Sequence, residues 1–266
     1  MLILCGLGSI TISTACGNRQ PIESVSPEQP SPTTPRQITA PPPEPLAEQA
    51  EPASETITLA EGLRLNRTER WIELDGFVPI DVRETDRTGF TLIRYLECIV
   101  VTPTSGKDHE ALMVTSVRPS TIHAAMLTLG LEPGKPGSVR WDGTTIISSP
   151  ASGGSVTITY RTADQPPPGS PITDFITHAD TGEPFAAPPL TESPQWVFAG
   201  SLLVGDRYVA DAEGLVVGMH TFGSELIALE TAISPDSFIE EPRWIAHPER
   251  TPPFGTEAIV RITARN

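Results

Sequence analysis

Short runs of alternating hydrophobic and polar residues dominate this 266-residue chain from residue 56 onward. Runs of four to eight residues that are rich in β-branched and aromatic side chains, and that end at Gly, Pro, Asn or Asp, are typical of β-strands. The pattern predicts strands over 57–65, 71–80 with a turn at Asp75-Gly76, 90–101, 110–117, 155–161, 196–201, 201–210, 215–221 and 257–263.

One segment has a different period. Pro119 and Ser120 are residues that open helices, apolar residues recur at helical spacing from Ile122 to Leu129, and Gly130 is a helix stop. The sequence therefore predicts an α+β, mainly β fold: a single domain of many short antiparallel strands with one principal α-helix at about 120–130. We expect the runs 90–101 and 110–117 to form a hairpin before this helix.

The first 55 residues have no such pattern. Residues 1–16 form an uncharged, apolar to small leader that ends in Ser-Thr-Ala-Cys16, which is typical of a bacterial lipoprotein signal with Cys16 as the lipidated residue. The alternative is an ordinary cleaved secretory signal and a secreted or periplasmic protein. Residues 17–55 are rich in Pro, Glu, Gln, Ser and Thr, so we expect a disordered linker before the domain at 56–266.

Charge and cysteine content narrow the functional classes. A net charge of −15 argues against a nucleic-acid partner, because binding to phosphates requires clustered Lys and Arg. Only Cys98 lies beyond the leader, and a single cysteine inside an apolar run is more typical of a buried side chain than of a reactive thiol.

Ionisable residues gather at one place, in Lys107, Asp108, His109 and Glu110, and His123 follows on the predicted helix. In an extended strand Asp108 and Glu110 would face one side and His109 the other, so the motif alone does not complete a metal site. A zinc site would need His109 and His123 to meet in the fold, with Glu97 as a further ligand. A hydrolase triad of Ser201, His109 and Asp211 is a further alternative. Otherwise the cluster is architecture or a recognition surface.

Several stretches, taken together and in order, resemble the YdjY-domain family of exported bacterial proteins of planctomycete type. They are GKDHEALM at 106–113, STIHAAMLTLGLEPGKP at 120–136, DFITHADTGEP at 174–184, WVFAGS at 196–201, YVADAEGLVV at 208–217 and PPFGTEAIVRI at 252–262. The resemblance implies a shared fold. The protein that gives the family its name is linked to iron–sulfur electron transfer, but its cluster-binding cysteines have no counterpart here, so no iron–sulfur cluster is expected.

The sequence thus favours an exported envelope protein, held to the membrane by an N-terminal lipid, that acts as a non-catalytic binding or structural module without a cofactor. Its partner would be an envelope protein or a small ligand. The alternative is a metal-dependent, zinc-type enzyme centred on His109 and His123.

Overall fold

The computed structural model describes residues 55–185 and 195–265. The expected signal segment, Cys16 and nearly all of the expected linker lie outside the described residues. No helix in the described part of the chain is long and apolar enough to cross a membrane.

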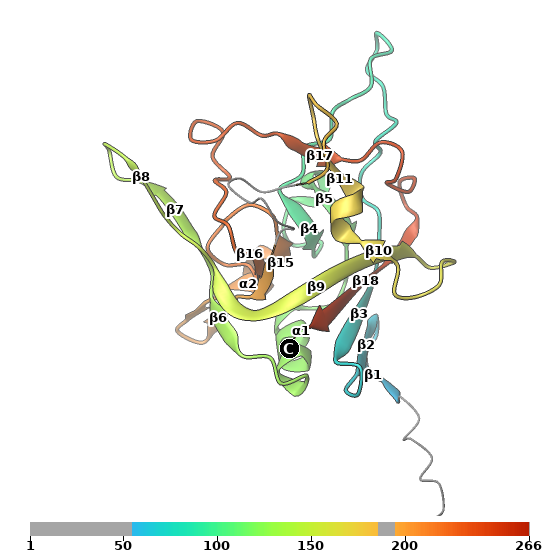
Figure 1. Cartoon of the computed structure of the whole chain (residues 1–266), viewed down its shortest axis with the longest axis vertical. Helices are drawn as coiled ribbons and strands as arrows, with labels where there is room; N and C mark the ends of the chain where they lie inside the picture. The colour runs from blue at the N-terminus through green and yellow to red at the C-terminus, as the bar shows by residue number, and fades with distance from the viewer. Residues whose placement is uncertain (1–54, 186–194, 266) are drawn as a thin grey trace, which may run out of the picture. The chain divides into compact units, whose positions relative to one another are not determined.

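Eight strands close into a barrel (Figure 1). In spatial order they are β3 (Trp71–Phe77), β18 (Glu257–Ala264), β9 (Ser152–Thr162), β12 (Trp196–Phe198), β16 (Ile227–Leu229), β15 (Leu215–Gly218), β4 (Cys98–Val101) and β5 (Ala111–Val114). The ring closes where Phe77 of β3 pairs with Val114 of β5. Six of the eight neighbouring pairs are antiparallel, whereas β15–β16 and β4–β5 are parallel.

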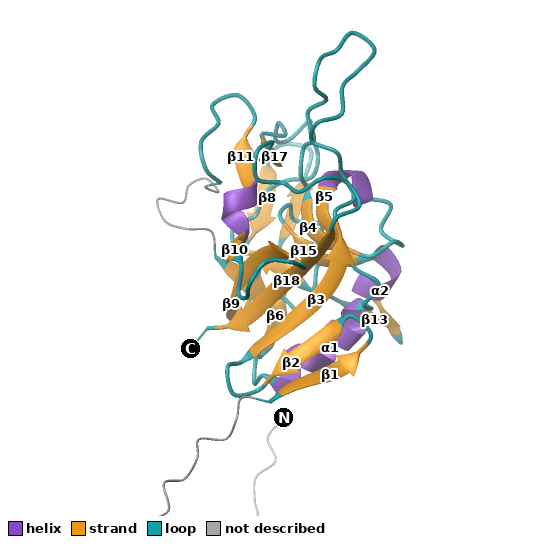
Figure 2. Ribbon diagram, turned by 90° about the vertical axis from the view of Figure 1, so that its right-hand side faces the viewer, coloured by secondary structure: helices purple, strands orange, loops and turns teal. Residues whose placement is uncertain are grey.

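The remaining elements surround this barrel (Figures 1 and 2). β1 (Thr56–Ala60) and β2 (Leu63–Asn66) extend the sheet beyond β3, and β6 (Pro133–Lys135) and β10 (Ser170–Pro171) pair with β9. Three small sheets are β7 (Ser138–Trp141) with β8 (Ile146–Ser149), β11 (Ile176–His178) with β17 (Trp244–Ala246), and β13 (Leu203–Val204) with β14 (Arg207–Tyr208). The helices are α1 (Pro119–Thr128), α2 (Val209–Glu213), η1 (Asp108–Glu110) and η2 (Ile172–Phe175).

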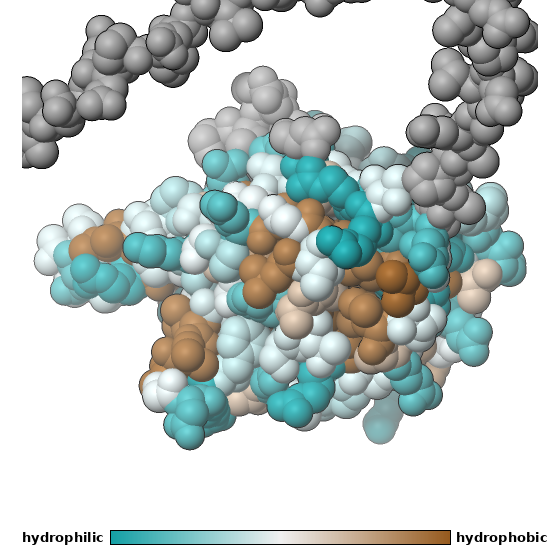
Figure 3. Space-filling view, turned by 90° about the horizontal axis from the view of Figure 1, so that it is seen from below, coloured by the Kyte–Doolittle hydropathy of each residue, from teal (hydrophilic) through white to brown (hydrophobic). Residues whose placement is uncertain are grey.

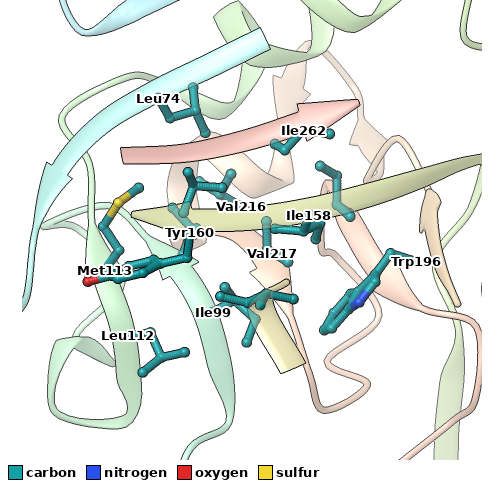
Figure 4. Packing of buried hydrophobic residues seen from close by; sticks show 14 of the residues in the cluster. Leu74, Ile99, Leu112, Met113, Ile158, Tyr160, Trp196, Val216, Val217 and Ile262 are labelled. Atoms are coloured by element: carbon teal, nitrogen blue, oxygen red, sulfur yellow. The ribbon is translucent and has the colours of Figure 1, made fainter. Parts of the chain in front are cut away.

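The core fills the barrel interior. β18 alternates strictly, with Ala258, Val260, Ile262 and Ala264 buried, as period-two patterning requires. Figure 4 shows side chains of β3, β9 and β18 gathered with those of β4, β5 and β15 in one cluster. Because β4, β5 and β15 are also covered on their outer face, every residue in them is buried and their sequences are continuous apolar runs.

α1 confirms the predicted principal helix. Its apolar side chains Ile122, Ala125 and Met126 are buried in the barrel core, and Gly130 follows it with a φ of 76°. The mainly β fold with one long helix is confirmed as well. Figures 1 and 2 both show α1 at the lower end of the barrel.

Three local predictions are wrong. Residues 201–210 do not form one strand, because they contain the β13–β14 hairpin and the first residues of α2. Residues 90–101 and 110–117 do not form a hairpin, because β4 and β5 are parallel, with Cys98 beside Ala111 and Val101 beside Val114. Residues 90–97 instead bond to other segments: the amide of Leu92 donates to the carbonyl of Glu84, and that of Leu96 to Trp244. The expected turn at Asp75-Gly76 is also absent, since β3 continues through both residues.

Candidate functional site

Lys107 is the centre of the charged segment that follows β4. Its ammonium nitrogen forms ion pairs with the carboxylates of Glu97 and Glu110, the second at 3.3 Å, and lies 4.9 Å from the ring centroid of Phe222. Burial acts to lower the pKa of Lys107, but the hydrogen bond to Glu97 and the two negative charges outweigh burial and raise it. Lys107 is therefore charged, and it joins the residue before β4 to the end of η1.

Asp108 and His109 stand apart from this ion pair. They lie in the 3-10 helix η1, not in a strand, because the amide of Lys107 donates to the hydroxyl of Ser105 and the amide of Glu110 donates to the carbonyl of Lys107. Both side chains are 64% exposed, and His109 approaches Asp108 and Glu110 only at 3.8 and 3.7 Å. These distances are too long for good hydrogen bonds.

The structure does not bring His109 and His123 to one place. His109 lines a pocket of about 340 Å³ beside Asp81 and Arg94, whereas His123 lines a second pocket that shares no residue with the first. Glu97 is engaged by Lys107. Within residues 55–185 and 195–265, no group of three or more His, Cys, Asp or Glu side chains could hold a metal ion. The zinc site thus stays a prediction, and the described residues do not bring its expected ligands together.

Two buried titratable side chains lie near Lys107: Cys98, whose burial the sequence predicted, and His220, which the sequence pattern did not reveal. Cys98 is fully buried; burial raises the pKa of its thiol well above the usual value, against the smaller effect of the Lys107 charge. The backbone amide of His220 donates to the carbonyl of Glu97, while its Nδ1 atom is buried without a hydrogen-bond partner in the described part of the chain. Burial lowers the pKa of His220 to about 4, although the charge of Glu240 acts to raise it.

Glu225 is the most deeply buried carboxylate of this region. It is fully buried and accepts hydrogen bonds from the amides of Phe222 and Gly223. Burial raises its pKa, and the backbone amides only partly offset that rise. Its role is to fold the turn between β15 and β16, and no periodicity in the sequence distinguishes such a residue from an exposed one.

The His123 pocket is larger, about 490 Å³, and none of its lining side chains is charged. Pro133, Leu202 and Leu203 give it apolar surface, and Ser120, His123, Ser201 and Tyr208 give it polar groups. Ser120 and His123 come from α1, and Tyr208 ends the β13–β14 hairpin, so residues far apart in sequence converge here.

Hydrogen bonds fix the polar wall of this pocket. The Nδ1 atom of His123 is 2.8 Å from the hydroxyl oxygen of Tyr208, which lies 3.0 Å from the carbonyl oxygen of Gly200. The imidazole also contacts the rings of Phe198 and Tyr208 edge-on, at centroid distances of 4.8 and 5.6 Å. Burial lowers the pKa of His123, against a smaller opposite effect of the Gly200 carbonyl, and raises the pKa of Tyr208. Both side chains are neutral near pH 7.

Ser201 has the strained backbone of the site, with a φ of 59° in a residue that is not glycine. Its hydroxyl donates to the carbonyl of Ser224 at 2.6 Å and accepts from the amide of Ala210 at 3.1 Å. Asp211 binds the amide and hydroxyl of Ser120 and pairs with Arg118. The triad of Ser201, His109 and Asp211 is therefore not assembled, because each member has a separate structural partner or pocket.

The family comparison covers the barrel and both pockets. A model of the YdjY domain matches residues 65–263, about three quarters of the chain. The chain belongs to the YdjY domain family. The match includes Lys107, His123 and Tyr208, so the charged cluster and the larger pocket are both parts of the YdjY domain of this chain. No curated protein matches the chain, and no solved structure does.

Proposed function

We propose that this YdjY domain is a non-catalytic binding module, and that its ligand site is the His123 pocket. Support comes from the pocket's size and lining: about 490 Å³ is within the range of small-molecule sites, with apolar walls and a few convergent polar groups. The chain is exported and is held at the bacterial envelope by a lipid on Cys16, as the leader sequence predicts.

One observation favours binding over catalysis. The hydroxyls of Ser201 and Tyr208 both bond to main-chain carbonyls, those of Ser224 and Gly200. A nucleophilic hydroxyl needs a base that takes its proton, and the Ser201 hydroxyl donates instead to the carbonyl of Ser224, which cannot act as a base. The pocket thus offers fixed recognition groups and no activated nucleophile.

The face of the molecule in Figure 3 supports a small ligand more than a broad protein contact. Figure 3 shows the side of the molecule that lies at the bottom of Figure 1, and its hydrophobic residues form separate patches divided by hydrophilic ones. A continuous apolar area is the usual mark of a stable protein interface. If cross-linking in intact cells captured an envelope protein, the partner would be that protein and not a small ligand.

Two exposed neighbours on the β13–β14 hairpin allow a matched test. Leu203 is 69% exposed and lines the pocket, whereas Val204 is 65% exposed and does not. Indole and 1-methylindole, two small apolar probes, should shift the methyl NMR signals of Leu202, a pocket residue that both variants keep, at millimolar concentration. Leu203→Asp should weaken the binding of both probes at least tenfold, and Val204→Asp should leave the binding of both probes unchanged. No shift with either probe, or equal loss in the two variants, would count against the pocket.

Anchoring is tested separately. Cys16→Ser should move the protein from the detergent phase to the aqueous phase in a detergent partition of whole cells, because the lipid attachment atom is removed. Cys5→Ser, a change in the same leader, should leave the partition unchanged. Aqueous partition of the unaltered protein would refute the lipid anchor and favour the secreted alternative.

A further inference from the structure

The Tyr208 hydroxyl determines which nitrogen of His123 carries a proton. This hydroxyl has one hydrogen and two close partners, the Gly200 carbonyl oxygen and the Nδ1 atom of His123. A carbonyl oxygen only accepts hydrogen bonds, so both contacts are satisfied when Tyr208 donates to Gly200 and His123 donates through Nδ1. The opposite arrangement would leave the Gly200 contact without a hydrogen.

The other ring nitrogen is consequently an acceptor. With the proton on Nδ1 of a neutral imidazole, Nε2 carries the lone pair. Tyr208 binds Nδ1 and His123 lines the pocket, so Nε2 is the ring nitrogen left to bind a ligand. Because burial lowers the pKa of His123, the ring is neutral near pH 7 and this lone pair is available.

The ring cannot easily flip, which would put a ring carbon in place of each nitrogen. Phe198 and Tyr208 contact it edge-on, with interplanar angles of 70° and 86°. A flip would place a C–H group against the Tyr208 hydroxyl and break the hydrogen bond that links His123 through Tyr208 to Gly200. His123 is thus a fixed acceptor set between apolar walls.

Charge plays little part in what the pocket selects. None of the side chains that line it is charged, and the nearby Asp211 and Arg118 pair with each other at 2.9 Å. A carboxylate or phosphate group would therefore meet no cation, and would place its own acceptors against the lone pair of Nε2. An ammonium group would find no carboxylate to replace its water.

We infer that this pocket recognises an uncharged apolar or aromatic ligand group that carries one N–H or O–H donor, and that the donor bonds to Nε2 of His123. The inference rests on the proposed binding function and specifies its ligand class. Indole fits the class, and 1-methylindole is the matched probe, because it keeps the aromatic surface but has no donor.

The experiment combines two independent readings on the full chain labelled with ¹⁵N. Ring-nitrogen NMR at pH 7 should show His123 with a protonated Nδ1 and an unprotonated Nε2. In titrations, indole should bind about three- to tenfold more tightly than 1-methylindole, which is the value of one net hydrogen bond. A protonated Nε2, or equal affinities for the two probes, would overturn the inference while leaving the pocket as a binding site.

Tyr208→Phe tests the hydrogen bonds from His123 to Tyr208 and from Tyr208 to Gly200. It removes the hydroxyl that accepts a hydrogen bond from Nδ1, so the imidazole should become a mixture of both tautomers. The ratio of the affinity for indole to that for 1-methylindole should then fall toward one. Retained affinity for 1-methylindole shows that the variant pocket is still folded. If neither probe binds the unaltered protein, the proposed function fails together with the inference; a preference for indole that persists in Tyr208→Phe overturns the inference alone.

Discussion

At the scale of single residues, the most conspicuous ionisable motif of the chain is architectural. Lys107 holds Glu97 and Glu110 together, and the exposed side chains of Asp108 and His109 form no short hydrogen bond with any described residue. Of the pocket residues, His123 and Ser201 were predicted only in other roles, as a zinc ligand and as a nucleophile, and no role was predicted for Tyr208.

Replacing Lys107 tests this architectural role. Lys107→Met should lower the free energy of unfolding by about 1–2 kcal/mol, between the values for exposed and for buried ion pairs, because it leaves Glu97 and Glu110 close together without a cation. Urea unfolding measures the change. Asp108→Asn, in the same η1 segment but 64% exposed, should change it by less than about 0.5 kcal/mol. Equal effects of the two changes would show that the ion pairs are not structural.

His220 should make stability depend on pH. Its pKa is about 4 in the folded protein and 6.5 in the reference state, so the unfolded chain takes up a proton first as the pH falls. Stability is therefore full above pH 6.5 and is lost between 6.5 and 4, by about 3 kcal/mol for this group. Urea unfolding of the protein and of His220→Gln over this pH range measures the contribution of His220. The comparison separates His220 from carboxylates such as Glu225, whose raised pKa makes the protein more stable as the pH falls.

A matched histidine serves as the control for this experiment. His109→Gln changes a side chain that is 64% exposed and should keep the pH slope of the unaltered protein. If the dependence of stability on pH persisted in His220→Gln but disappeared in His109→Gln, His109 and not His220 would be its source.

At the scale of elements, the predictions succeeded where one period governs a long run. β9 and β18 were found because their buried residues alternate, and α1 because caps and helical spacing agree. The hairpin at 90–117 was wrong because an apolar run carries no information on strand direction, and β4 and β5 are buried on both faces. Three-residue strands such as β16 are too short for a period to be read.

Gly76 marks the seam where β3 meets β5. A Cβ atom there would lie 2.3 Å from the carbonyl oxygen of Val114, and the hydroxyl of Thr115 donates to the carbonyl of Asp75 at 2.7 Å beside it. Gly76→Ala should thus cost about 3 kcal/mol, since the obstructing atom is main chain of the neighbouring strand. Thermal and urea unfolding measure the loss.

Gly106 gives the comparison for the seam. It has a φ of 66° and open space around it, so Gly106→Ala should cost only the backbone strain of about 1 kcal/mol. A seam variant no less stable than Gly106→Ala would mean that β3 and β5 separate at little cost, and that the barrel is not held closed at this point.

At the scale of the whole molecule, the barrel joins strands that the sequence separates widely. β18, the last strand, lies between β3 and β9 and forms seven residue pairs with each of them. The His123 pocket depends on the same arrangement, because α1, the turn after β12 and the β13–β14 hairpin meet only in the closed fold. Local pattern identifies such elements but not their neighbours, so the pocket could not be predicted from the sequence.

This topology predicts opposite effects for truncation at the two ends. Every described strand begins at or after Thr56, so a chain that lacks residues 1–54 should keep the urea midpoint and the indole affinity of the full chain. Removal of 257–266 deletes β18 and leaves β3 and β9 each without a partner along the edge that β18 occupied; cooperative unfolding should then be lost. Denaturation followed by circular dichroism distinguishes the two. A lower midpoint after removal of 1–54 would instead mean that those residues stabilise the barrel.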